Sequence, residues 1–150
     1  WSARPPLIMT LSEDTRRLVR KRAGNRCEYC QSHQDYTMGR MQIDHIWPQA
    51  KSGSDDLDNL CLACELCNQY KWTKTSGVDP ATGETTELFN PRSDRWADHF
   101  LWSQNGILIH GLTACGRATV EALRLNNLLA VTVRRNWVIA GWHPPTTSND

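Results

Sequence analysis

The sequence predicts an α+β fold, in which a small metal-stapled unit has a helix before it and a β-hairpin plus helices after it. Three observations support this prediction. Two C-x-x-C pairs, at 27–30 and 64–67, offer ligands for one metal ion. Between them, residues 40–48 (RMQIDHIWP) alternate in the manner of a strand. Further on, two apolar runs flank Asn105-Gly106, which is the strongest short-range signal for a hairpin.

The composition is that of an ordinary soluble globular protein. Of 150 residues, 39% are hydrophobic and 22% are charged, which argues against disorder. No apolar run approaches the roughly 18 residues that a membrane span needs, so we expect no membrane partner. Six cysteines in a chain without a secretory signal layout favour a metal over disulfides, and with it a reducing, cytoplasmic location.

The segment before the first cysteine pair is predicted to be a short helix. Ser12 is a good N-cap, acidic residues follow it in the first turn, basic residues fill the last turn, and Gly24 ends the helix. The helix is expected to carry Leu11, Leu18 and Val19 onto the core.

The chain divides into five parts by composition. The first part is a flexible segment, upstream of the fold or appended to it, that takes little part in the structure. It is followed by a core, then by a linker rich in Gly, Pro and Thr, a hairpin-helix extension and a disordered tail. Their ranges are 1–11, 12–75, 76–95, 96–143 and 144–150. Within the core, residues 56–74 contain helix formers interrupted by thiols. Within the extension, helices are expected after Thr113 and after Asn126.

The clustered thiols indicate zinc. Thiolates are soft ligands that prefer zinc to magnesium or calcium, and a site of four thiolates has no open position for substrate, so its role is structural. His33, close to Cys30, is a less favoured replacement ligand. An iron–sulfur cluster of the ferredoxin type would need a fourth cysteine and then a proline, but the chain has Lys71 and Trp72 at those positions.

Asp44-His45 is the chemically informative dipeptide between the two pairs. It combines a hard oxygen ligand with the one side chain whose unperturbed pKa is near neutrality. Such neighbours point to opposite faces of a strand, but at the end of a strand both can border one cleft. Alone, the pair is more often a surface or capping arrangement.

The set of spaced residues from Arg26 to Lys71 resembles the zinc-stapled HNH endonucleases, whose core is the ββα-metal (His-Me) finger. The residues that carry the resemblance are Asp44-His45, Asn59, Cys67-Asn68 and Lys71, framed by the two C-x-x-C pairs. The stretches LFNPRSDRWADHF, GLTACGRATVEALRLNN and RRNWVIAGWHPP are similar to an extension found on bacterial HNH proteins, for which no chemistry is assigned.

The resemblance implies a role for each residue. His45 would be the general base, and Asp44 and Asn68 would hold one catalytic divalent cation, Mg²⁺, Mn²⁺ or Ni²⁺. Asn59 would be a catalytic-site residue that fixes the loop or orients His45, although it could also cap a following helix. Lys71 would contact a nucleic-acid phosphate, unless it lies on a solvated helix face.

The same resemblance selects the zinc ligands among five clustered thiols. Cys27, Cys30, Cys64 and Cys67 would bind zinc, because only this choice places Asn68 directly after a ligand. Cys61 is then expected to be a small buried residue.

The function implied is that of a metal-dependent HNH endonuclease, a hydrolase that nicks or cuts DNA as a monomer or homodimer. The alternative is a zinc-stabilised nucleic-acid-binding module without catalysis. The alternative also uses the basic charge of residues 1–26, which hold seven Lys or Arg against two acids. The residues in question, which could equally form a solvated face, are Arg16, Arg17, Arg20, Lys21, Arg22 and Arg26.

Overall fold

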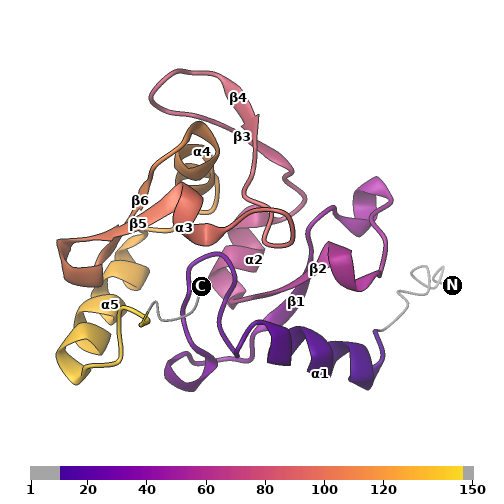
Figure 1. The fold of residues 1–150 in the computed structure, drawn as a ribbon, viewed down its shortest axis with the longest axis horizontal. Helices are drawn as coiled ribbons and strands as arrows, with labels where there is room; N and C mark the ends of the chain where they lie inside the picture. Colours follow the sequence, from indigo (N-terminus) through magenta and orange to yellow (C-terminus); the bar gives the residue numbers. More distant parts are fainter. Residues whose placement is uncertain (1–10, 147–150) are drawn as a thin grey trace, which may run out of the picture.

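A computed structural model describes residues 11–146 of the chain (Figure 1). The predicted flexible segment therefore lies outside the described residues except for Leu11, and so does the end of the predicted tail. The helices are α1 (Glu13–Arg22), α2 (Glu65–Lys71), α3 (Trp96–His99), α4 (Ala114–Ala122) and α5 (Leu128–Ala140). The strands are β1 (Gln42–His45), β2 (Leu60–Ala63), β3 (Ser76–Val78), β4 (Thr85–Glu87), β5 (Phe100–Ser103) and β6 (Leu108–Gly111). The α+β class is confirmed.

Helix α1 follows the sequence prediction. The Ser12 hydroxyl accepts a hydrogen bond from the backbone N–H of Thr15 at 3.1 Å, and Gly24 takes the positive φ of +62° that glycine tolerates best. Val19 is fully buried, but Leu18 is half exposed, so the expectation that Leu18 enters the core is wrong. The reason is its position, because Leu18 and Val19 are neighbours on a helix and cannot share one face.

Strands β1 and β2 pair antiparallel and lead directly into α2, which gives the ββα order of elements. Asp44 lies opposite Cys61 in this pairing, and His45 lies opposite Leu60. The sequence reading of residues 60–63 as helix formers is wrong for β2. All four residues of β2 are buried, so the strand lacks the apolar–polar alternation that would have revealed it.

The extension contains the predicted hairpin and two predicted helices. Strands β5 and β6 are joined by a turn in which Asn105 (φ 59°) and Gly106 (φ +94°) adopt left-handed backbone conformations. Thr113 caps α4 and Asn127 caps α5, each through its side-chain oxygen. The short helix α3 precedes the hairpin and was not anticipated.

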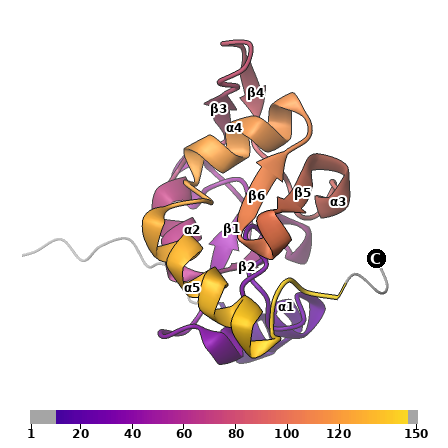
Figure 2. The ribbon, with the colours of Figure 1, turned by 90° about the vertical axis from the view of Figure 1, so that its left-hand side faces the viewer.

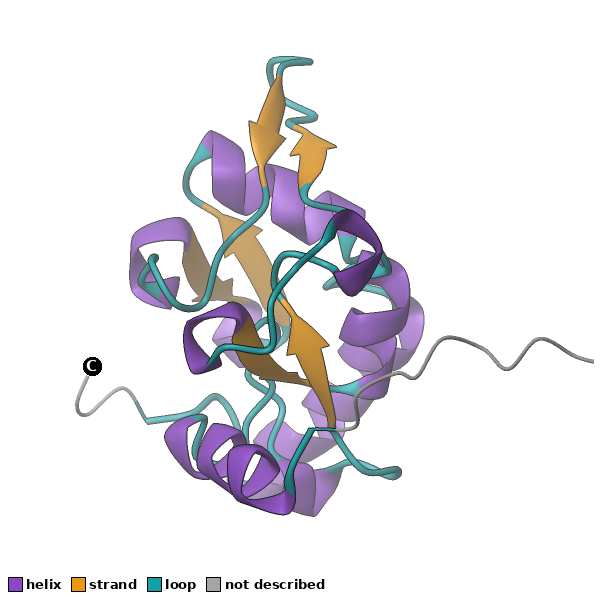
Figure 3. Ribbon diagram, turned by 90° about the vertical axis from the view of Figure 1, so that its right-hand side faces the viewer, coloured by secondary structure: helices purple, strands orange, loops and turns teal. Residues whose placement is uncertain are grey.

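Residues 76–95, read as a linker from composition, contain the β3–β4 hairpin. Figure 3 shows this hairpin at the top of the molecule, above a helix, and the contacts identify that helix as α4. Buried Asp79 accepts hydrogen bonds from Nε and Nη2 of Arg117 in α4, at 2.9 and 2.8 Å. A bidentate ion pair therefore fastens the segment to the extension.

One continuous apolar core joins the two halves of the chain. It extends from Val19 in α1 through β2 to Leu125, just after α4. The Trp96 indole donates a hydrogen bond to the Tyr29 carbonyl at 2.8 Å, and Tyr36 packs against Trp137. In Figure 2, α4 and α5 cover the same side of the molecule as α2. No helix among the described residues has the length and apolar character needed to cross a bilayer.

The Asp79–Arg117 ion pair should make stability depend on pH. The hydrogen bonds from Arg117 hold the pKa of Asp79 well below its usual range. Since the unfolded-state pKa is about 3.9, this contribution is complete at neutral pH and is lost as the pH falls below that value. Asp79→Asn should therefore lower the melting temperature at neutral pH and weaken its fall in acid, as measured by circular dichroism.

Glu84→Gln is the matched control, because Glu84 is exposed in the same hairpin. It should preserve the pH dependence of the unaltered protein. An Asp79→Asn protein with that same pH dependence would contradict the role assigned to the ion pair.

Candidate metal and catalytic site

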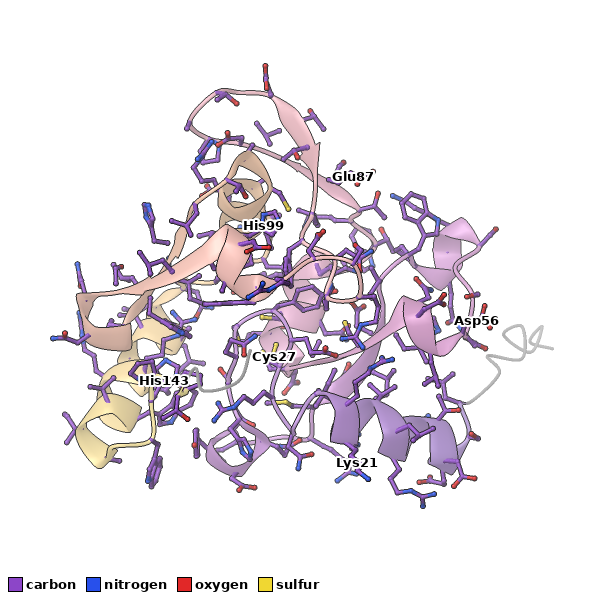
Figure 4. The ribbon with its side chains drawn as sticks, in the orientation of Figure 1. Lys21, Cys27, Asp56, Glu87, His99 and His143 are labelled. Carbon is purple, nitrogen blue, oxygen red and sulfur yellow. The ribbon has the colours of Figure 1, made fainter. Side chains whose placement is uncertain are left out.

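Four cysteines from two distant segments meet at one point. The Sγ atoms of Cys27, Cys30, Cys64 and Cys67 all lie within 4.8 Å of one another. Both C-x-x-C segments fold into the same turn, in which the N–H of the second cysteine donates to the sulfur of the first at 3.4 Å. Figure 4 labels Cys27 near the middle of the molecule. The predicted set of four is thus brought together, and it could form a zinc site.

The electrostatics of the cluster suit a dication. Burial raises the pKa of the Cys27 thiol, whereas hydrogen bonds from the three neighbouring cysteines lower that of Cys30. One thiolate thus disfavours ionisation of its neighbours, and a bound cation would relieve that repulsion. The ring of His33 is engaged elsewhere, since its Nδ1 accepts a hydrogen bond from the N–H of Asp35 at 3.0 Å.

Cys61 lies outside the cluster. Its side chain is fully buried in β2, and its thiol donates to the Tyr29 hydroxyl at 3.4 Å. The expectation that Cys61 is a small buried residue is confirmed. Burial is the main cause that raises the pKa of its thiol, and the charge of Asp44 adds to the effect, so Cys61 stays protonated.

The two cysteines Cys61 and Cys64 should respond differently to substitution. Cys61→Ala should keep a single zinc per chain, because its sulfur is not among the four. Cys64→Ala should lose the zinc and unfold, since a three-thiolate site no longer ties the two segments together. Metal analysis with circular dichroism measures both. Zinc retained by Cys64→Ala, or lost from a folded Cys61→Ala protein, would refute the ligand assignment.

Asp44 is buried and contacts the segment that carries the first cysteine pair. The residue is 6% exposed. Its carboxylate accepts a hydrogen bond from the Tyr29 hydroxyl at 2.8 Å. Tyr29 lies between Cys27 and Cys30 in sequence, so the turn of the first cysteine pair directly positions this carboxylate. Burial, together with the charges of Cys61 and Asp44, raises the pKa of Tyr29, which keeps its hydroxyl available as a donor.

Lys71 points inward, contrary to both sequence interpretations. Its ammonium lies 3.1 Å from Asp44 Oδ2 and donates to the carbonyls of His45 and Ile46, also at 3.1 Å. The side chain is 2% exposed, so it neither reaches a phosphate nor lies on a solvated face. The buried carboxylate of Asp44 explains this placement, because an uncompensated charge at that depth would be costly.

Asn68 lies on the face of α2 that crosses β1. Its amide N–H donates to the side chain of Gln42, which leaves the amide oxygen free for another partner. Lys71, one turn further along α2, contacts Asp44, two residues further along β1. The side-chain oxygens of Asp44 and Asn68 thus come from neighbouring positions of two packed elements and could serve as metal ligands. Such a sparse set fits Mg²⁺, which usually keeps several waters.

His45 is held by a carboxylate that the sequence analysis missed. Its Nε2 lies 2.7 Å from Asp55 Oδ1, and its side chain is 15% exposed. Asp55 belongs to the loop between β1 and β2, at the right of Figure 4, where Asp56 is labelled. The acidic run SDDLD was visible in the sequence, but spacing alone could not select which of its carboxylates meets the imidazole.

Asn59 closes the same loop. Its side chain accepts from the N–H of Trp47 at 2.8 Å and donates to the carbonyls of Trp47 and Ser54 at 3.0 and 2.8 Å. Because a strand and not a helix follows Asn59, the capping alternative does not apply. The asparagine therefore fixes the loop that carries Asp55.

A second group of ligand atoms occurs in the extension. One ligand atom from each of three residues lies within 4.8 Å of the other two, and these residues are Asp94, His99 and Cys115. The polar atoms of two of them already have partners in the protein, since the His99 ring bonds Thr113 at 2.6 Å and Asp94 accepts from the N–H of Asn90 at 2.9 Å. These bonds support a structural role for His99.

Comparison with known families locates a domain within the chain. Residues 27–74 match the family model described as HNH endonuclease, which covers both cysteine pairs, β1, β2 and α2. The expected resemblance is confirmed for this segment. No curated protein and no solved structure matches the chain significantly.

Proposed function

We propose that this chain, whose residues 27–74 form an HNH endonuclease domain, is a metal-dependent endonuclease that hydrolyses DNA phosphodiester bonds. One observation carries the proposal: Asp44 and His45 end a strand that packs on α2, and a carboxylate already orients the imidazole. A protein that only bound nucleic acid would have no need of a buried ligand carboxylate beside an oriented base.

The geometry supports a part for His45 as the general base of the proposed reaction. With Nε2–H donating to Asp55, Nδ1 carries the free lone pair and can take a proton from water. That water would attack the phosphorus as the P–O3′ bond breaks, and the leaving O3′ would take up a proton from solvent, so that the products are a 5′-phosphate and a 3′-hydroxyl. Asp55 holds the tautomer and the ring orientation, as the acid of a catalytic triad does.

Asp44 and Asn68 would hold the catalytic cation. When bound there, it would offset the negative charge that develops on the phosphate and on the leaving oxygen. The Tyr29 hydroxyl and the Lys71 ammonium both contact Oδ2 of Asp44, so they orient the carboxylate while its Oδ1 remains available. Zinc on the four cysteines has a separate, structural role in this proposal.

The second candidate is a zinc-stabilised nucleic-acid-binding module without catalysis. The observation that favours it is the ion pair of Asp44 with Lys71, which already balances the charge of the carboxylate without a divalent cation. The two candidates differ in cleavage, since both would bind nucleic acid.

Each chain carries a single proposed active site. A monomer would therefore nick one strand, and a homodimer or two successive events would be needed to cut both. The reduced thiols that a four-cysteine zinc site requires fit the cytoplasm.

The nuclease proposal is tested by the loss of its base. Purified protein with supercoiled plasmid and Mg²⁺, Mn²⁺ or Ni²⁺ should convert the plasmid to nicked or linear forms. His45→Ala should abolish this conversion and leave the zinc content unchanged, because His45 lies outside the cysteine cluster. A gel assay measures cleavage. Binding without cleavage by the unaltered protein in all three metals would support the second candidate instead.

The role of Asp55 predicts a selective kinetic defect. Asp55→Asn should reduce kcat by roughly tenfold to a hundredfold, the usual range for a residue that orients a functional side chain, and leave KM unchanged. Asp56→Asn is the matched control, because Asp56 is exposed and adjacent but makes no side-chain contact with His45 in the described structure. Equal rates for the two variants would refute the positioning role.

A further inference from the structure

Four arginines line one hollow on the surface of the protein. Arg16, Arg17 and Arg20 come from α1, and Arg40 comes from the segment before β1. The hollow has a volume of about 310 Å³, and Glu13 is the one acidic side chain in its wall. This cluster, here called the arginine pocket, lies outside the residues proposed for catalysis.

The arginines of the pocket differ in whether they already have a hydrogen-bond or ion-pair partner in the protein. Arg17 forms an ion pair with Asp14, and Nε of Arg16 donates to the Leu11 carbonyl at 3.1 Å. Within residues 11–146, the guanidinium groups of Arg20 and Arg40 make no hydrogen bond or ion pair. The free protein therefore presents at least two uncommitted guanidinium groups to solvent at one place.

Like charges in the pocket repel one another. Arg16 and Arg20 are one helical turn apart, a spacing at which equal charges destabilise a helix. Burial is the main cause that lowers the pKa of Arg20, and the charges of Arg40 and Arg16 add to the effect. A bound anion would remove this repulsion, and guanidinium groups match the oxygens of a phosphate particularly well.

Helix α1, which carries most of the pocket, is fixed against the β1–β2 unit that holds the proposed catalytic residues. Arg22 at the end of α1 donates to the carbonyls of Leu57 and Leu60, at 2.9 and 2.6 Å, which fixes α1 against the loop and β2. Arg40 and His45 are five residues apart on one nearly extended segment, so their backbones are at most about 18 Å apart. A nucleic-acid strand rises about 3.4 Å per nucleotide, so one short duplex can reach both sites.

We propose that the arginine pocket binds a backbone phosphate of duplex DNA, several nucleotides from the bond that is cut, through Arg16, Arg20 and Arg40. The inference rests on the proposed function for the identity of the partner. It adds a second contact point, which sets how the duplex lies along β1. Arg40 was not among the basic residues singled out by sequence, because it is remote from α1 along the chain.

The test measures affinity as a function of salt. A short fluorescein-labelled DNA duplex is titrated by anisotropy with the His45→Ala protein in Mg²⁺, so that cutting does not interfere. Replacing both Arg20 and Arg40 by glutamine should weaken binding and reduce the slope of log Kd against log salt by roughly 0.9 for each lost phosphate contact. Arg135→Gln, at an exposed arginine of α5, is the matched control and should change neither.

A gain of affinity provides the complementary measurement. Glu13→Gln removes the acid from the wall of the pocket and should tighten DNA binding, a result that misfolding cannot produce. The inference would be overturned if the slope of log Kd against log salt were the same for the double variant and for Arg135→Gln. It would also be overturned if the double substitution weakened binding to an RNA duplex but not to DNA. If the arginine substitutions weaken DNA binding but the unaltered protein never cuts DNA, the proposed function is overturned and the inference about the arginine pocket is retained.

Discussion

The meeting of Cys27, Cys30, Cys64 and Cys67 is the constraint on which the rest of the structure depends. It ties the segment after α1 to the start of α2, and each side of this tie carries a functional group. On one side, Tyr29 reaches from the first turn to the carboxylate of Asp44. On the other, Cys64 caps α2, and the helix then presents Asn68 and Lys71 to β1. The cysteine cluster thus positions Asp44 and Asn68, the ligands of the proposed catalytic cation.

The chain beyond the family-matched domain supports this arrangement. Arg92, in the segment 76–95, pairs with Glu28, whose carboxylate also accepts from the N–H of Leu62, so this segment holds the first cysteine turn against β2. Buried Arg134 of α5 lines the same cavity as three of the cysteines, and their charges counter the lowering of its pKa by burial. A buried cation at this place would offset the negative charge of four thiolates around a bound zinc ion. The extension therefore shares one apolar core with the domain.

Local chemistry explains which features were predictable. The caps Ser12 and Thr113 and the turn at Asn105 act over a few residues, so their signals survive in the sequence. Contacts between distant segments leave no such trace. Strand β2 is apolar on both faces, so its sequence has no apolar–polar alternation. The β3–β4 hairpin is polar because it lies at the surface, and it is held there by the contact of Asp79 with Arg117.

The same distinction applies to the site. A four-thiolate zinc site was predictable because ligand type and spacing are both specific, whereas the choice of four among five thiols was made through family resemblance. Asp44, His45 and Asn68 were found in the same way. The inward turn of Lys71 and the pairing of His45 with Asp55 depend on how α2 and the loop fold back on β1. No pattern of residues along the chain encodes that geometry.

X-ray absorption at the zinc edge of the purified protein tests the central claim most directly. If the four cysteines hold the metal that organises the fold, the first shell should contain four sulfur atoms at about 2.3 Å. A first shell with nitrogen or oxygen ligands, or a folded protein that contains no zinc, would contradict the account.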